Sequence, residues 1–321
     1  MAKNATVFEG NSAGDNLSSE YIGFATLFSV LIMTDLIGNT LVILVITTNT
    51  NMRTSMNYVL VNLAIADILV AIFMGVKFVI TPTFVHPYGI TGQYLCKFIT
   101  GGTTAWTAAV ASIYSLVGIS IEAHQVAFHP RKRRVGPGRS LYKTLVLIWL
   151  VALLWGLPLY LSVTYVENLG TCAEQWPHPV FPKIYSFGWI IVAGVFPIAT
   201  MSILYFKVVR RLWFKENPDC SQSQMAFLRS KKRITAMVIL VSIIYVICWV
   251  PTLMIYFLVS VLPSESMYSV LHKTTIALAT FNSSVNPIVY SLRSHQFRKS
   301  LYKLIWCYKE RRQNIQVVPL R

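Results

Sequence analysis

Long apolar segments dominate the chain and repeat along its whole length. Each is long enough to cross a hydrocarbon layer of roughly 30 Å, which takes about 20 mainly apolar residues in a helix. The seven segments span residues 22–47, 57–82, 96–122, 143–164, 185–212, 234–260 and 269–291. Backbone groups in lipid find no water to bond, so such segments form helices or barrel strands, and these lack strand-like alternation. The pattern predicts an all-α membrane protein with a seven-transmembrane helix bundle over residues 22–291.

Polar segments flank the bundle at residues 1–21 and 292–321. The first has no signal-peptide core, so we expect helix 1 to act as the signal anchor. Its sequons at Asn4 and Asn16 are candidate glycosylation sites, although sequons are also frequent by chance. The second contains SLRSHQFRKSLYKLIWC, which mixes apolar and basic residues in the manner of a short amphipathic helix 8 on the inner leaflet. Cys307 at its end is a candidate palmitoylation site.

The composition supports a membrane protein and its charge predicts an orientation. The 321 residues are 55% hydrophobic and only 12% charged, which is unusual for a soluble domain. A net charge of +16 could indicate nucleic acid, but 23 of the 28 Lys and Arg lie at Arg53, within 131–143, within 207–233 and after Tyr290. These are alternate loops and the C-terminus, so the positive-inside rule places them in the cytoplasm and the N-terminus outside the plasma membrane. Attraction to anionic lipid is a second consequence, and no nucleic-acid partner is expected.

The five cysteines divide between the two sides of the membrane. Cys96 and Cys172 fall on the outside, an oxidising compartment where a disulfide between them can form. Cys220 and Cys307 fall inside and Cys248 lies within a helix, so we expect none of these three to be bridged. The chain has no metal-ligand spacing and no CxxC.

Asp67 lies within the apolar run VNLAIADILVAIF, where an ionisable group is costly. One explanation is a carboxyl that desolvation keeps protonated and that bonds nearby amides. The other is a cation site or proton relay, since Ser112, Asn282, Ser283 and Asn286 offer oxygen atoms at similar depth. These polar neighbours favour the second explanation.

Two further residues lie deep in the predicted helices. Asn39 is expected to bond backbone groups of helices 2 and 7, whereas Trp149 is more often a packing residue. Prolines interrupt four helices, either for packing shape alone or as hinges. The four are Pro158, Pro197, Pro251 and Pro287.

Together these motifs resemble the rhodopsin-like (class A) G-protein-coupled receptors. They occur in every helix, in order: GN at 38–39, LAIAD at 63–67, Cys96 with ASIYSLVGISIE at 111–122, Trp149, Pro197 with Tyr205, CWVP at 248–251 and NSSVNPIVY at 282–290. No single motif is specific, but the complete ordered set is.

The resemblance implies roles for individual residues. Cys96 and Cys172 match the disulfide that pins the second outside loop over the ligand pocket. A sodium pocket, with Na⁺ as an allosteric ion and no other cofactor, is implied for Asp67, Ser112, Asn282, Ser283 and Asn286. An activation switch is implied for Trp249, Tyr245 (where phenylalanine is more usual), Pro251, Tyr205, Pro287 and Tyr290.

The resemblance fails at the sequence SIEAH. Glu122 matches the family's acid, but Ala123 stands where an arginine is usual. The foot of helix 6 has Lys231 and Lys232 where an acid would pair with that arginine. We therefore hypothesise a reversed pair, in which Glu122 accepts a bond from one of the two lysines in the inactive state.

The outside loop TYVENLGTCAEQWPHPVF predicts a short hairpin about its glycine. Its acidic residues Glu167 and Glu174 are either solvated loop charges or an attraction for a basic peptide. The loop is similar to those of neuropeptide receptors, of the Arg-Phe-amide and neuropeptide Y-like kinds. Pocket candidates, which could equally be packing or aromatic-belt residues, are Trp106, Glu174, Trp176, Tyr256, Ile276 and Thr280.

Other ligand classes fit less well. The position of the retinal-binding lysine is Thr280 here, which excludes an opsin. The amine-binding aspartate would fall at Ala105 or Thr103, depending on the direction of counting, because the segment from Cys96 to Glu122 is two residues longer than usual. The extra residues are expected to be absorbed near Gly101-Gly102.

These observations predict a cell-surface receptor for a peptide or small molecule, with a heterotrimeric G protein or arrestin as its inner partner. The alternative is a decoy or atypically coupled receptor, because Ala123 replaces the arginine. A transporter or channel is more remote, since no internal repeat occurs. Nothing indicates an enzyme.

Overall fold

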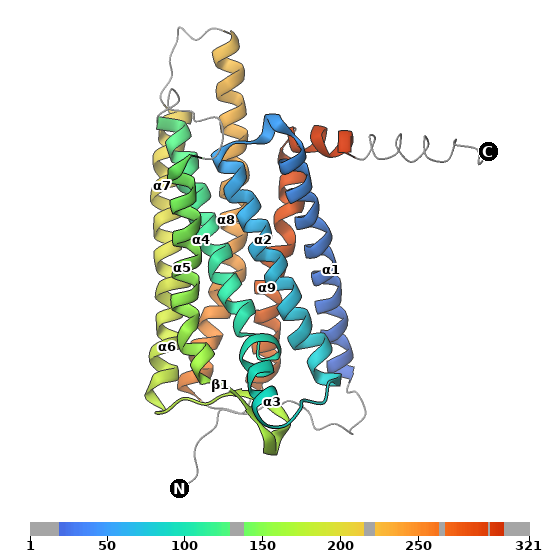
Figure 1. Cartoon of the computed structure of the whole chain (residues 1–321). Helices are drawn as coiled ribbons and strands as arrows, with labels where there is room; N and C mark the ends of the chain where they lie inside the picture. The colour runs from blue at the N-terminus through green and yellow to red at the C-terminus, as the bar shows by residue number, and fades with distance from the viewer. Residues whose placement is uncertain (1–18, 129–137, 215–221, 263–266, 295, 305–321) are drawn as a thin grey trace, which may run out of the picture.

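Helices along a common axis occupy the positions that the apolar segments predict (Figure 1). The structure is a computed structural model, which describes residues 19–128, 138–214, 222–262, 267–294 and 296–304. Its long helices are α1 (Ser19–Thr48), α2 (Ser55–Gly75), α4 (Thr103–Phe128), α5 (Arg139–Ser162), α6 (Val180–Ile190), α7 (Phe196–Trp213), α8 (Gln222–Val261) and α9 (Met267–Arg293). Helices α6 and α7 are two halves of one span, so the bundle has the predicted seven spans.

Six spans in the described residues are long and apolar enough to cross a membrane. The seventh, α9, is less apolar because it contributes polar residues to the interior, such as Asn282 and Asn286, which are both buried. Large apolar side chains such as Leu154 and Ile247 instead lie exposed on the outer surface. This inversion of a soluble protein suits a bundle whose solvent is lipid.

Three spans change helical period partway along. Single π-helical turns occur at Val76–Ile80, Cys96–Thr100 and Ile191–Val195. A π turn leaves backbone groups out of register with their usual partners and often marks a functional site. The second is followed by a break at Gly101-Gly102, before α4 begins at Thr103. The break lies at the glycine pair where the two extra residues are expected to be absorbed.

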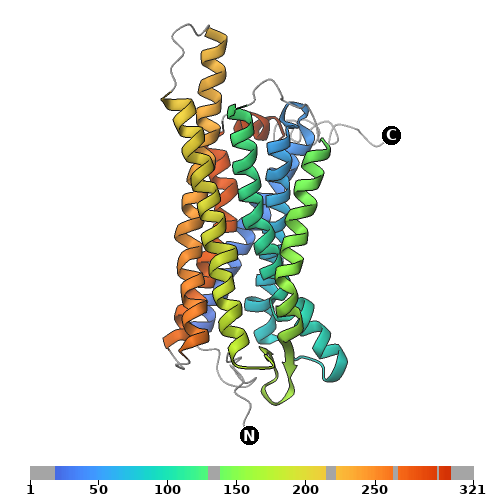
Figure 2. The same cartoon turned by 90° about the vertical axis from the view of Figure 1, so that its left-hand side faces the viewer.

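The predicted hairpin is confirmed as an antiparallel pair of strands, β1 (Val163–Val166) and β2 (Thr171–Glu174). Their register pairs Val163 with Glu174 and Val166 with Thr171. Gly170 has a φ of +62° in the turn, a conformation in which glycine costs nothing. The hairpin lies with α3 (Gly89–Leu95) at one end of the bundle (Figures 1 and 2). We call this the hairpin end.

The opposite end contains Arg211 and Lys231, and we call it the basic end. A short helix over residues 296–304 lies there, beside the ends of α1 and α9 (Figure 1). Phe297 and Ser300 on one face are buried, whereas Arg298 and Lys299 are exposed. The expected amphipathic helix is therefore confirmed. The candidate modification sites Asn4, Asn16 and Cys307 lie outside the described residues.

Candidate functional site

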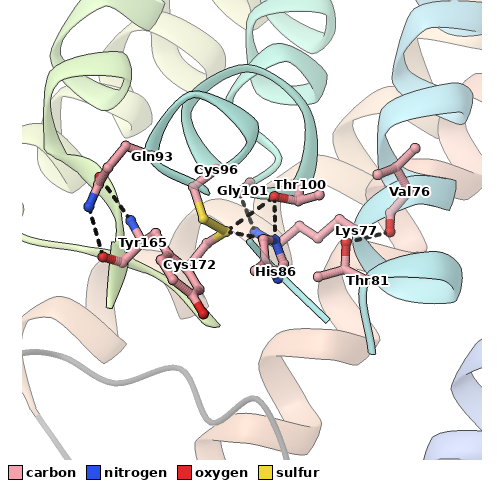
Figure 3. Close-up of a disulfide and its surroundings, with 10 residues drawn as sticks. All are labelled: Val76, Lys77, Thr81, His86, Gln93, Cys96, Thr100, Gly101, Tyr165 and Cys172. Atoms are coloured by element: carbon pink, nitrogen blue, oxygen red, sulfur yellow. Dashed lines mark hydrogen bonds between the residues drawn. A yellow bond between two sulfur atoms is a disulfide. The ribbon is translucent and has the colours of Figure 1, made fainter. Parts of the chain in front are cut away.

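A disulfide fastens the hairpin to the helix beneath it, as the sequence predicts (Figure 3). Cys96, in the π turn before α4, is bonded to Cys172 in β2, with their Cα atoms 5.5 Å apart. The side chain of Gln93 adds a second attachment. Its Nε2 donates to the backbone oxygen of Tyr165 at 3.0 Å, and its Oε1 accepts from the Tyr165 N–H at 3.1 Å.

A buried histidine lies against the same disulfide. His86 Nε2 is 2.9 Å from Thr100 Oγ1 and 3.6 Å from Cys172 Sγ (Figure 3). Burial lowers the pKa of His86 below its ordinary value, so the ring is neutral at pH 7. The imidazole also stacks on Tyr165, with 5.4 Å between ring centroids. These contacts make the hairpin, the disulfide and the loop before α3 one packed unit.

Lys77 of α2's π turn fills the break before α4. Its Nζ donates to the backbone oxygen of Gly101 at 3.0 Å (Figure 3). Gly102 has a φ of +84°, which L side chains rarely adopt. Nothing in the sequence singles out Lys77, which is one of the five Lys and Arg outside the basic loops and the C-terminus.

Gly102→Ala is expected to lower the thermal unfolding temperature more than the matched control Gly89→Ala. Both glycines have positive φ, at +84° and +70°, so both variants lose about 1–2 kcal/mol to backbone strain. A Cβ at Gly102 would also lie 2.6 Å from Lys77 Cδ and displace that side chain, whereas a Cβ at Gly89 has nothing within 4 Å. Thermal unfolding of the purified variants measures the difference, and equal shifts would contradict the account of Lys77.

Glu174 is the charged residue of the hairpin that faces the bundle. Its Oε2 accepts from Trp176 Nε1 at 2.9 Å, and the carboxyl also interacts with Tyr256 of α8 and, electrostatically, with Lys77. Burial raises the pKa of the Glu174 carboxyl, and the Trp176 bond and Lys77 offset part of that rise. Glu167 differs, because it is exposed and accepts only a 3.3 Å bond from the Gly89 N–H among the described hydrogen bonds.

An aromatic column descends from the hairpin into the bundle. Trp176 packs on Tyr185, with 5.2 Å between centroids, and Tyr185 on Trp189 at 6.3 Å. Trp189 then stacks on Trp249 at 6.4 Å, and Trp249 contacts Tyr245 at 6.1 Å. We refer to these five rings as the aromatic column.

The remaining pocket candidates divide into two groups. Trp106 joins the column, with its ring 6.0 Å from Trp189 and 6.3 Å from Trp249. Ile276 and Thr280 are buried in α9, and Thr280 Oγ1 donates to the Ile276 carbonyl at 3.0 Å. The sequence did not identify Tyr185 and Trp189, although aromatic residues four apart on one helix were a signal.

Asp67 lies fully buried at the centre of the bundle. Its Oδ1 accepts from Ser112 Oγ at 2.6 Å and its Oδ2 from Asn286 Nδ2 at 2.9 Å. Ser283 also interacts with this carboxyl, and Asn282 is buried one turn away from Asn286 on α9. The predicted polar residues of helices 2, 3 and 7 are thus brought together.

Asn39 and Trp149 both make polar contacts. Asn39 Nδ2 reaches the backbone oxygen of Ser283 at 3.4 Å, which confirms the expected link to helix 7. Trp149 Nε1 donates to Asn62 Oδ1 at 3.0 Å, so it is more than a packing residue.

A second buried carboxyl, which was not predicted, lies next to this cluster. Asp35 of α1 is fully buried, and its Oδ1 accepts from Asn39 Nδ2 at 2.8 Å. Its position within a membrane-length apolar segment, four residues before Asn39, was the signal that would have identified it.

Tyr205 and Tyr290 lie below this polar core, toward the basic end. Tyr205 Oη is 3.0 Å from Ser242 Oγ, which joins α7 to α8. Tyr290 is buried, and its hydroxyl has no hydrogen-bond partner among the described residues. Higher up, the Tyr245 hydroxyl donates to the carbonyl of Ala193, in the π turn between α6 and α7. The tyrosine in place of phenylalanine thus binds a carbonyl beside the change in helical period.

Both lysines at the foot of α8 make contacts that the sequence did not predict. Lys231 Nζ donates to the backbone oxygen of Val126 at 2.7 Å, and Lys232 Nζ lies over the Trp213 ring at 5.4 Å from its centroid. The reversed pair between Glu122 and one of these lysines stays a prediction.

Two cations together cap the end of α4. Beside the Lys231 bond, Arg211 Nε donates to the Ala127 carbonyl at 3.2 Å. The last carbonyls of a helix have no partner within it and form the negative end of its dipole, so cations are favourable there. Ala123, one turn earlier, is buried and small. Helices α7 and α8 are thus tied to the backbone of α4 rather than to an arginine side chain on α4.

Known proteins resemble the chain over most of its length. Residues 38–290 match the model of the 7 transmembrane receptor (rhodopsin family). The pyroglutamylated RF-amide peptide receptor of Rattus norvegicus is 28% identical over 312 residues, which cover 89% of this chain and 70% of that receptor. The substance-P receptor of Homo sapiens is 28% identical over 285 residues, covering 86% and 69%. The somatostatin receptor type 5 of Rattus norvegicus is 29% identical over 290 residues, covering 87% and 76%.

The family match begins within the first span and covers every motif on which the resemblance depended, including the polar core and the segment around Glu122. Proteins of this family are receptors and not enzymes, as the sequence predicts. The chain belongs to the rhodopsin family of seven-transmembrane receptors.

Proposed function

We propose that this protein is a plasma-membrane receptor that binds a basic peptide at its hairpin end and activates a G protein at its basic end. The hairpin end lies outside the cell and the basic end lies in the cytoplasm, in accord with the positive-inside rule. The relatives named for RF-amide peptides, substance P and somatostatin support a peptide ligand. Arrestin and inner-leaflet lipids are further partners that this assignment includes.

The aromatic column is the observation that carries the proposal. It connects Trp176, beside the carboxylate of Glu174, to Trp249, beside Pro251 in α8. A peptide that displaces Trp176 changes the packing beneath it, since close-packed side chains transmit shifts to their neighbours. The proline in α8 gives that helix a kink about which its foot can move.

We propose further that the polar core around Asp67 holds a cation, with Na⁺ as the ion that the sequence resemblance implies. The side-chain oxygens Oδ1 of Asn282 and Oδ1 of Asn286 are buried and have no hydrogen-bond partner among the described residues. Buried acceptors without a donor are costly, and carboxylate, amide and hydroxyl oxygens suit a hard cation. Asp67 and Ser112 complete the set of residues that would hold it.

Ala123 favours a second candidate function, in which the receptor binds its ligand without ordinary G-protein activation. A buried alanine offers no guanidinium to pack against a G protein. This alternative differs from the first only at the basic end. A transporter or channel is not supported by the family match.

A screen of basic peptides on cells that express the receptor tests the proposal. The panel pairs amidated and free-acid forms, and each peptide has a control in which Arg is replaced by Glu. We expect saturable binding and a G-protein signal for a subset of the basic peptides. Saturable binding with an arrestin signal alone would favour the atypical receptor, and binding that is indifferent to the Arg-to-Glu exchange would contradict a basic ligand.

A further inference from the structure

Asp35 is unusual because half of its carboxylate has no partner. Its Oδ1 accepts from Asn39, but its Oδ2 is buried without a hydrogen-bond partner among the described residues. The side chain is fully buried, so bulk water cannot donate a hydrogen bond to it. A buried carboxyl of this kind is stabilised either by protonation or by a compensating positive charge.

Asn39 links Asp35 to the polar core around Asp67. One Nδ2 reaches both Asp35 Oδ1 at 2.8 Å and the Ser283 carbonyl at 3.4 Å, and the Ser283 side chain interacts with Asp67. The two carboxyl groups are close enough to repel each other electrostatically. Asp35 is therefore an outer part of the same buried cluster.

The cluster has several buried oxygen atoms without a hydrogen-bond donor among the described residues. Asp35 Oδ2, Asn39 Oδ1 and Asn286 Oδ1 have no hydrogen-bond partner among the described residues. Asn39 bonds Asp35 through its Nδ2, and Asn286 bonds Asp67 in the same way. The unpartnered oxygen of each amide therefore lies close to one of the two carboxyl groups. No lysine, arginine or histidine contacts either carboxylate in the described ranges.

The donor set indicates the class of cation. Only oxygen atoms are present, which favours hard ions over zinc or copper. Two carboxylates have two negative charges, which one monovalent ion cannot neutralise in a buried site. Ca²⁺ accepts six to eight oxygens in flexible geometry, whereas Mg²⁺ demands a near-ideal octahedron and loses its water reluctantly.

We propose that Asp35 supplies a second carboxylate to the core cation site and thereby makes it a Ca²⁺ site rather than one for Na⁺ alone. The inference rests on the proposed cation site at Asp67 and adds the ion that this chain's own residues select. Extracellular Ca²⁺ would then stabilise the receptor from within the bundle.

Purified receptor in neutral detergent, free of anionic lipid, allows the test without an agonist. Thermal unfolding is followed in N-methylglucamine buffer with added CaCl₂ or NaCl, and ⁴⁵Ca²⁺ binding is measured in parallel. For the wild type, we expect Ca²⁺ to raise the unfolding temperature at lower concentration than Na⁺. Asp35→Asn, which keeps the shape of the side chain, should weaken Ca²⁺ binding by about tenfold or more and Na⁺ by much less, because only the second charge is lost.

Asp67→Asn and Glu122→Gln serve as comparison variants. Asp67→Asn should abolish the effect of both ions, and Glu122→Gln, outside the cluster, should change neither. Stabilisation of the wild type by Na⁺ but not Ca²⁺, or equal Ca²⁺ binding in wild type and Asp35→Asn, would overturn the role of Asp35 and leave the cation site standing. If neither ion stabilised the wild type, the cation site itself would be wrong.

A measurement on the unmodified protein covers the case in which Asp35→Asn does not fold. Competition between ⁴⁵Ca²⁺ and NaCl on the wild type should require a large molar excess of Na⁺ to displace the bound calcium. Displacement at equal concentrations, or an absence of calcium binding, would overturn the proposal.

Discussion

Lys231→Met is expected to raise agonist-independent signalling by about an order of magnitude. The lysine ammonium donates to the Val126 carbonyl at 2.7 Å and is buried at the junction of α4 and α8. A hydrogen bond to a charged group contributes about 1.5–3 kcal/mol, and 1.4 kcal/mol corresponds to a factor of about ten in an equilibrium. Methionine keeps the apolar stem and removes only the ammonium, so the closed arrangement loses this bond and the foot of α8 moves outward more often.

Lys232→Met is the matched control for this experiment. Its ammonium lies over the Trp213 ring and does not bond α4 in the described contacts, so basal signalling should change by no more than about twofold. Two measurements suffice: basal nucleotide exchange, and the distance between spin labels at the basic ends of α4 and α8. A longer distance in Lys231→Met but not in Lys232→Met is the expected result, whereas identical distance distributions would contradict the tie to the α4 backbone.

Glu122→Gln separates this tie from the ion pair that the sequence suggested. In the structure Lys231 bonds a backbone oxygen of α4, so we expect this variant to alter basal signalling less than Lys231→Met does. A larger effect of Glu122→Gln would restore the ion pair as the main restraint.

Glu174→Gln is expected to lower the potency of a basic peptide by roughly 30-fold, because truncating one partner of a buried charge pair costs about 2 kcal/mol or more. Glu174 is held by Trp176 at the top of the aromatic column. Glu167→Gln is the control, since that exposed residue interacts with solvent and should change potency by less than about threefold. Concentration–response curves for a basic peptide and its Arg-to-Glu form provide the measurement, and equal losses in both variants would contradict the assignment.

The buried carboxyl of Glu174 also predicts that peptide affinity depends on pH. Burial raises the pKa of Glu174, so its ionised form is lost at a higher pH than that of an ordinary glutamate. The affinity of the wild type for a basic peptide should therefore fall as the pH is lowered toward that raised pKa, and Glu174→Gln should remove this dependence. Binding isotherms at several pH values, with Glu167→Gln as control, test it.

Much of the architecture follows from residue order alone. The helices were predictable because a membrane-length apolar segment without alternation is stable in lipid only as a helix. The turn at Gly170 and the break at Gly101-Gly102 were predictable because glycine readily adopts the positive φ values found at Gly170 and Gly102. The polar core was predictable because few polar residues lie at that depth. Asp35 is an oversight rather than a limit of the sequence, since it satisfies the same criterion as Asp67.

Contacts with backbone carbonyls could not be predicted in this way. Lys77 bonds Gly101 O, Lys231 bonds Val126 O and the Tyr245 hydroxyl bonds Ala193 O. Every residue has a carbonyl, so the sequence does not show which one is freed by a π turn or a helix end. Charge pairing between side chains was the natural expectation for Lys231, and its bond to the Val126 carbonyl was not foreseen.

Agonist-dependent nucleotide exchange by purified components is the most direct test of the central claim, which is that this receptor activates G proteins although Ala123 replaces the family's arginine. The receptor is placed in lipid nanodiscs with each class of heterotrimeric G protein and a peptide that binds it saturably. We expect the peptide to accelerate exchange on at least one class, and Lys231→Met to accelerate it without peptide. Saturable peptide binding with no exchange on any class, in either protein, would contradict the claim and identify an atypically coupled receptor.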